Sequence, residues 1–225
     1  MSLVHSEVWF DVLDWARGPG LSLAFWLMLG GLAVRVGEIL RLGRKHNFAR
    51  AKGRSILQGL KTIFTRSLPA PHLVRRAPAV HVGGWVFHLG FVCVLLFASA
   101  HIRVFENWFT VPWSKWPGEV VGLIALVTVA ALLFVLVTRI AHPVRRRIST
   151  FGDYAAWVLT FLPLLTGLAS AYDWLDAPAL LKVVHVLSVE ALMVLLPFTK
   201  LTHGLTTVLA RYYNGSIQGF KGAKS

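Results

Sequence analysis

The stretch 179–203, ALLKVVHVLSVEALMVLLPFTKLTH, decides the fold predicted for this chain. Its apolar part is long enough for one α-helix to cross the hydrocarbon core of a bilayer, which takes about 20 residues. His185 and His203 are eighteen residues apart in it. On one helix they would share a face, roughly 27 Å apart along the axis. This spacing predicts two axial-ligand sites stacked across a membrane.

The composition supports an integral membrane protein. Of 225 residues, 56% are hydrophobic and only 15% are charged, which is unusual for a soluble domain. We predict an all-α membrane protein with five transmembrane helices in a bundle that spans 1–210, followed by a tail at 211–225. Apolar length and flanking charge place the five spans at 21–40 (after the breaker Gly18-Pro19-Gly20), 79–102, 120–140, 154–172 and 179–202.

Of the 23 Lys and Arg residues, 18 lie in alternate loops. Ten Lys/Arg and no acid lie from Arg41 to Arg76, four Arg lie from Arg139 to Arg147, and four Lys/Arg follow from Lys200 onward. Seven of the ten acids lie in the other loops. By the positive-inside rule the N-terminus is outside and the C-terminus cytoplasmic. The basic residues therefore indicate orientation and give no reason to expect nucleic-acid binding.

The first inner loop, 41–78, is long for a simple connection. Apolar residues at helical spacing predict an amphipathic helix at about 55–66. Two interpretations stay open for this helix: it anchors on the lipid surface, or it docks a cytoplasmic partner.

The residues restrict the redox chemistry that is possible. Cys93 is the single cysteine, so a disulfide, an attached c-type haem and a cysteine-ligated iron–sulfur cluster are excluded. The chain also lacks the GxGxxG, P-loop, HExxH and nucleophile-elbow motifs. An enzyme with its own substrate pocket is not supported, and a redox centre would have to use histidine.

Five histidines lie in the predicted spans or at their ends: His81, His88, His101, His185 and His203. A histidine within hydrocarbon is costly and generally faces a bundle interior. Pairs of imidazoles from facing helices can hold haem iron on both sides. The alternative is that each imidazole only hydrogen-bonds a neighbouring helix.

Three local motifs resemble one family. They are Val184-His185-Val186 with Leu195-Leu196-Pro197-Phe198-Thr199-Lys200-Leu201-Thr202-His203, then Phe87-His88-Leu89-Gly90, and Thr150-Phe151-Gly152-Asp153. These are similar to the last helix, the second-helix ligand motif and the start of the fourth helix in the gamma subunit of respiratory nitrate reductase. The resemblance covers most of the chain, and the last-helix motif is its specific part.

The resemblance implies a dihaem b-type cytochrome. Carried over by position, His88 and His203 would hold the inner haem and His185 one side of the outer haem. The family's other ligand falls on Ala98 here. His101 is the nearest substitute and the one we favour. Because thirteen residues turn its face by about 220° from His88, a bend would be needed. His81, or a single haem, are the alternatives.

Further polar residues are candidates for cofactor contacts. Arg35 can pair with Glu38 or meet a haem propionate. Glu190 lies within the fifth span, where a carboxylate must be protonated or bonded, and it could move a proton in quinone chemistry. Lys115, with Glu119, lies near the outer quinone site that the family implies, or forms an ordinary interfacial pair.

These observations lead to one functional prediction and one rival. The prediction is a haem b subunit of a respiratory complex in the cytoplasmic membrane of a bacterium or archaeon. It would pass electrons between membrane quinone and a cytoplasmic iron–sulfur or molybdenum subunit, in either direction. The partner complex need not be nitrate reductase. The rival is a haem-free membrane anchor or small transporter whose histidines pack helices or relay protons.

Overall fold

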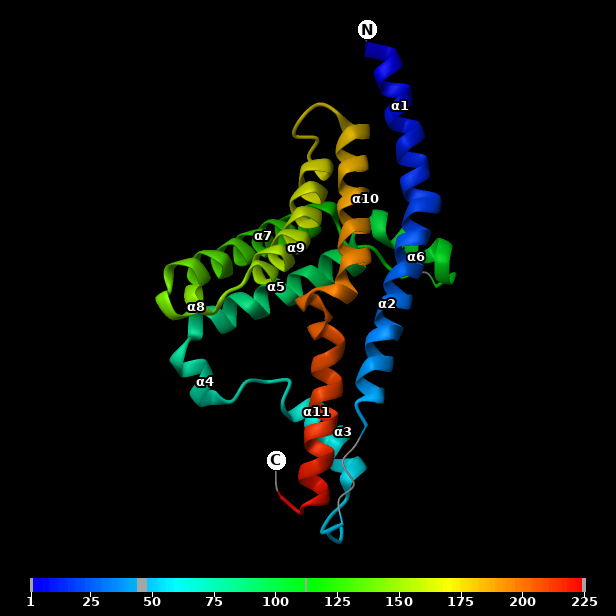
Figure 1. The fold of residues 1–225 in the computed structure, drawn as a ribbon. Helices are drawn as coiled ribbons and strands as arrows, with labels where there is room; N and C mark the ends of the chain where they lie inside the picture. The colour runs from blue at the N-terminus through cyan, green and yellow to red at the C-terminus, as the bar shows by residue number, and fades with distance from the viewer. Residues whose placement is uncertain (1, 44–47, 112, 224–225) are drawn as a thin grey trace. The chain divides into compact units, whose positions relative to one another are not determined.

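The described part of the chain, residues 2–43, 48–111 and 113–223, is helical and contains no strand in a computed structural model (Figure 1). Five helical stretches in it are long and apolar enough to cross a membrane, namely Glu7–Arg41, Pro78–Phe97, Gly118–Ala141, Phe151–Ala171 and Pro178–Phe198. The chain is therefore a multi-pass membrane protein whose surroundings are a lipid bilayer. Residues 44–47 of the predicted inner loop and 224–225 of the predicted tail lie outside the described residues.

The chain divides into two units, 1–27 with 79–195 and 28–78 with 196–225. Their placement relative to each other is not determined. The first unit holds α1 (Ser2–Trp15), the π-helix η1 (Ala16–Gly20), the start of α2 (Leu21–Arg41), α5 (Pro78–Phe97), α6 (Ser99–Phe109), α7 (Gly118–Ala141), α8 (Pro143–Ile148), α9 (Phe151–Ala171) and α10 (Pro178–Leu195). The second holds the rest of α2, α3 (Ser55–Thr65), α4 (Pro71–Arg76), the short 3-10 helices η2 (Leu196–Phe198) and η3 (Lys200–Thr202), and α11 (His203–Phe220).

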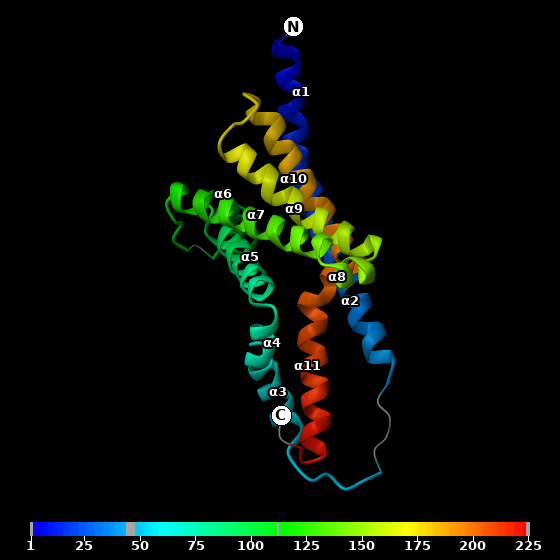
Figure 2. The ribbon, with the colours of Figure 1, turned by 90° about the vertical axis from the view of Figure 1, so that its left-hand side faces the viewer.

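In the first unit, α10 packs between α9 and α1, and α7 packs on the other side of α9 (Figures 1 and 2). Val129, Leu132 and Leu164 form its buried apolar centre. Helix α5 approaches α7 closely at Gly90. A Cβ at this position would clash with the Thr128 side chain, so the missing side chain permits the approach. Small residues at such contacts let membrane helices pack without large side chains between them.

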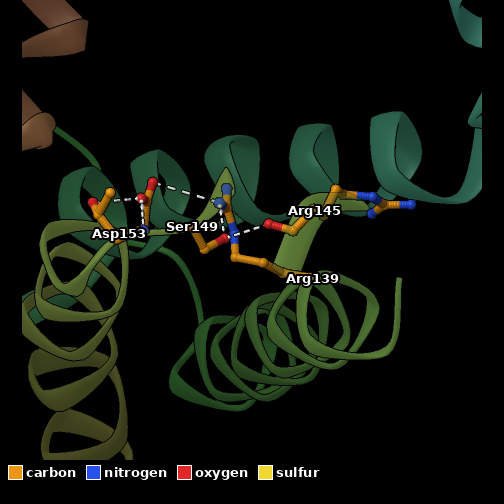
Figure 3. A network of polar contacts seen from close by, with 5 residues as sticks. Arg139, Arg145, Ser149 and Asp153 are labelled. Atoms are coloured by element: carbon orange, nitrogen blue, oxygen red, sulfur yellow. Dashed lines mark hydrogen bonds and ion pairs between the residues drawn. The ribbon is translucent and has the colours of Figure 1, made fainter. Parts of the chain in front are cut away.

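A polar network joins the end of α7 to the start of α9 (Figure 3). Arg139 donates to the Ser149 hydroxyl at 3.0 Å and pairs with Asp153 at 3.4 Å. Ser149 donates to the Arg145 carbonyl at 2.7 Å. Asp153 also accepts from the Thr150 backbone N–H at 2.9 Å, which forms a capping box. The Thr150-Phe151-Gly152-Asp153 motif thus starts α9 and fastens it to the preceding helix.

Three of the predicted helices have different limits in the structure. The Gly18-Pro19-Gly20 stretch does not break the first helix, because a wide π-turn accommodates Pro19 and the chain continues from α1 into α2. The helix predicted over 79–102 is interrupted at Ala98. The helix predicted over 179–202 ends at Leu195.

The interruption after Leu195 corrects the first expectation about the two histidines. His185 lies in α10, whereas His203 is the first residue of α11, so they do not share one helix. Pro197 has no N–H to donate and disfavours a helical residue before it, which explains the break. Helix α11 continues to Phe220, so most of the tail predicted from residue 211 is helical.

In the second unit, α3 and α11 pack side by side through small residues (Figures 1 and 2). A Cβ at Gly215 would lie 2.5 Å from the Thr62 Cβ and 2.7 Å from the Gln58 carbonyl oxygen. Ser55 donates to the Ser216 carbonyl at 3.0 Å, and the Lys52 N–H donates to the Phe220 carbonyl at 2.8 Å. The helix predicted at 55–66 therefore exists, and its small, polar face lies against α11.

We expect Gly215→Ala to separate α3 from α11, because the added methyl meets a backbone oxygen that cannot move freely. Overpacking of this kind costs about 1–3 kcal/mol. Amide hydrogen exchange of α3 in the full chain should become faster. Gly204→Ala is the matched control in the same helix, because an added Cβ there meets nothing within 4 Å. Equal exchange in the two variants would contradict the tight packing.

Candidate functional site

The break at Ala98 redirects the chain at one end of α5. Ala98 adopts an extended conformation (φ −70°, ψ 130°), and α6 begins at the next residue. A break leaves the last carbonyls of α5 without intrahelical partners, which is costly in an apolar medium. Trp113 Nε1 donates to the Leu96 carbonyl at 2.6 Å, and the Trp116 N–H donates to the Phe97 carbonyl at 3.2 Å. The loop after α6 thus stabilises the bend.

The same break turns His101 toward α10. The rings of His101 and His185 lie side by side, with centroids 6.1 Å apart and planes inclined by 21°. The bend between α5 and α6 lies at Ala98, the residue on which the resemblance places a histidine. Of the predicted ligands, these two are brought together by the structure.

The Nδ1 atom of each ring faces a hydrogen-bond acceptor. His101 Nδ1 lies 3.0 Å from the Val94 carbonyl oxygen, and His185 Nδ1 lies 3.3 Å from the Thr166 hydroxyl. The Thr166 hydroxyl gives its own proton to the Leu162 carbonyl at 2.6 Å, so it accepts from His185. With the proton on Nδ1, the lone pair of each imidazole is on Nε2, the arrangement found in metal-bound histidines.

Sequence reasoning did not identify Thr166 or Ser188. Ser188 donates to the His185 carbonyl at 2.7 Å, and its hydroxyl lies 3.1 Å from that of Thr166. The sequence shows only that each of the two residues is a hydroxyl side chain within an apolar span. Nothing in the sequence shows that α9 and α10 bring these hydroxyls to the same histidine.

His101 and His185 supply two imidazole donors. They could hold a metal whose other ligands belong to a cofactor. The two imidazoles could together bind one metal ion. Among the described residues, no group of three or more His, Cys, Asp or Glu side chains could hold an ion by itself. Haem iron would take its protein ligands from two such histidines, so these donors fit haem better than a metal held by protein side chains alone.

Burial also favours the neutral form of His101, which lies in α6 beyond the apolar span. Desolvation lowers the pKa of His101 below its ordinary value, and the bond to the Val94 carbonyl offsets this only in part. A neutral imidazole is the form that binds a metal.

The other predicted ligands, His81, His88 and His203, lie in other parts of the chain. His88, in α5, has Nδ1 2.6 Å from the Gly84 carbonyl oxygen, and His203 has Nδ1 2.9 Å from the Lys200 carbonyl oxygen. His88 belongs to the first unit and His203 to the second, so their pairing stays a prediction. His81 lies in the first turn of α5, and its role as an alternative ligand is likewise untested.

Arg35 is engaged by protein groups. Its guanidinium pairs with Glu38 at 2.8 Å and donates to the Pro197 carbonyl at 2.9 Å. The first of the two expected roles, a local ion pair, is thus present. The second bond satisfies a carbonyl at the break between α10 and α11.

The remaining candidates lie apart from one another. Glu190 in α10 approaches the π-turn, where a Cβ at Gly20 would lie 2.7 Å from Glu190 Oε1. That oxygen is buried without a hydrogen-bond partner among the described residues. Lys115, which precedes α7, and Glu119, in its first turn, are both exposed, and the described residues show no ion pair between them. A quinone role for these groups stays a prediction.

We expect Trp113→Phe to weaken the bend at Ala98, because phenylalanine keeps the ring but leaves the Leu96 carbonyl without its donor. An unsatisfied buried carbonyl costs about 1–3 kcal/mol. The thermal midpoint of the purified protein should fall. Trp174→Phe, at a position 54% exposed, is the control and should leave the midpoint unchanged. Equal midpoints would mean that this bond does not hold the bend.

Comparison with known proteins gives one relative. A protein of Nitratidesulfovibrio vulgaris (strain Hildenborough), described only as "Protein", is 26% identical over 208 residues, which cover 86% of this chain and 88% of that protein. No protein-family model matches the chain, and no solved structure matches it. The similarity extends over most of both chains, but it assigns no activity.

Proposed function

We propose that this chain is the haem b subunit of a membrane-bound respiratory complex, and that it passes electrons between membrane quinone and a cytoplasmic iron–sulfur or molybdenum subunit. One observation carries the proposal. His101 and His185 come from different helices and lie 6.1 Å apart with nearly parallel rings. Both Nδ1 atoms are engaged, which leaves the lone pairs on Nε2.

The residues have separate tasks in this proposal. His101 and His185 would hold one haem iron, and His88 and His203 would hold a second. When bound, a b-type haem supplies reversible one-electron chemistry. The Val94 carbonyl and the Thr166 hydroxyl fix the ring orientation and tautomer of the first pair. Arg35 stabilises the chain break that precedes His203.

The distribution of basic residues supports one orientation of the chain in the membrane. The loops between α2 and α5, and between α7 and α9, carry most of the basic residues, so we place them and the C-terminus on the cytoplasmic side. The loops around α6 and between α9 and α10 then face outward, and His101 and His185 belong to the outer site. A quinol oxidised to quinone near them would give its electrons to the haem and release its protons outside.

The first test is a reduced-minus-oxidised visible spectrum of the protein purified with its native partner. We expect b-type haem, two per chain, and the loss of one haem in His101→Ala and in His185→Ala because each removes an axial ligand. His142→Ala is the control, since His142 is exposed between α7 and α8. His81→Ala should also keep both haems.

Other outcomes separate the alternatives. One haem per chain in the unaltered protein would mean that one of the two sites does not form. Loss of haem in His81→Ala, with retention in His101→Ala, would assign the ligand to His81. The absence of haem would reject the cytochrome proposal in favour of a haem-free membrane anchor.

Thr166 gives a second prediction. Thr166→Val removes the acceptor for His185 Nδ1 but keeps the shape of the side chain. Loss of such a partner typically costs about 10–100-fold in metal affinity. It also makes the imidazole a weaker donor, so the reduction potential of this haem should rise. Redox titration should show the shift in Thr166→Val and much less of it in Thr166→Ser, which retains the hydroxyl.

The result for Thr166 can be distinguished from failure of the proposal as a whole. If the unaltered protein binds haem and both Thr166 variants keep its potential, then haem binding stands and the role of Thr166 is wrong.

A further inference from the structure

We infer that the outer face of α3 lies in the headgroup region of the bilayer and binds anionic lipid. This inference does not depend on haem. It concerns the face formed by Ile56, Leu57, Leu60 and Phe64, which we call the apolar face of α3.

The two sides of α3 differ in kind. Ser55, Gln58, Gly59 and Thr62 lie against α11, and Thr62 is only 3% exposed. At 100° per residue the apolar face is on the opposite side of the helix. Its side chains are 67%, 57%, 48% and 76% exposed in sequence order. Packing with α11 therefore cannot cover this face, and an exposed apolar patch of this size indicates a binding surface.

Charge favours a lipid surface over a protein partner. Arg54 and Lys61 border the apolar face, and Arg66 follows α3 directly. An open hollow lined by Arg54, Ile56, Leu57 and Leu60 combines an arginine with aliphatic side chains. A basic rim around a large apolar face is the pattern of helices that lie in the membrane interface. No acidic residue between Arg41 and Arg76 would oppose binding to anionic headgroups.

The chain itself brings this helix to the membrane. Helix α3 begins fourteen residues after α2 ends and ends thirteen residues before α5 begins. Both neighbours are candidate membrane spans. A lipid surface is thus always within reach of the apolar face, and no second protein is required to cover it.

The test measures the depth of single spin labels in the full chain. Leu60→Cys carries the label in a Cys93→Ser background, and Lys61→Cys is the matched control at the edge of the face. Each variant is reconstituted in nanodiscs of neutral lipid alone or with anionic lipid. Accessibility is measured to oxygen, which concentrates in the bilayer, and to a water-soluble nickel complex.

We expect the label at position 60 to be accessible to oxygen and shielded from nickel, and the label at position 61 to be more accessible to nickel. Anionic lipid should move the label at position 60 deeper. Nickel accessibility at position 60 equal to that at 61 would overturn the inference, because the face would be in water. Shielding from both reagents would also overturn it, because protein would then cover the face. Phe64→Cys repeats the measurement if Leu60→Cys does not fold.

Discussion

Every backbone N–H and C=O group inside an apolar membrane needs a partner from the protein itself. Continuous helices meet this requirement without help, but a broken helix does not. The chain interrupts its helices at Ala98 and after Leu195, and distant side chains supply donors at both places. Trp113 donates to the Leu96 carbonyl, and Arg35 donates to the Pro197 carbonyl. These two bonds permit the bends on which the positions of His101 and His203 depend.

The need for backbone hydrogen-bond partners also explains which parts of the fold the sequence could predict. Apolar length is a local property, and it identified five membrane-length helices, of which the third and fourth lie close to their predicted limits. The break at Ala98 is stabilised by an indole seventeen residues after Leu96, so no local sequence pattern predicts it. Pro197 was a visible signal for the other break, yet the long apolar run favoured one continuous helix. The capping box at Thr150 needed only neighbouring residues, and its motif was legible in the sequence.

The candidate site likewise has residues that the sequence could predict and residues that it could not. Histidines in apolar spans could be selected from the sequence because burying an imidazole is costly. Their partners could not, because the Val94 carbonyl and the Thr166 hydroxyl meet them only through the bend and the packing of α9 on α10. Arg35 was selected for its charge, but its bond to the Pro197 carbonyl joins residues 162 positions apart.

The position of His101 shows how a bend changes which side chains face each other. In the pattern that this chain resembles, the histidine falls on the residue that is Ala98 here. On an unbroken helix, a shift of three residues would turn the side chain by about 300° and move it by about 4.5 Å along the axis. The extended residue at Ala98 ends α5 and lets the first turn of α6 take a new direction. His101 thereby faces His185 although the helical periodicity of α5 alone would not place it there. Spacing along one helix therefore predicts which side chains face a neighbouring helix only where the helix continues without a break.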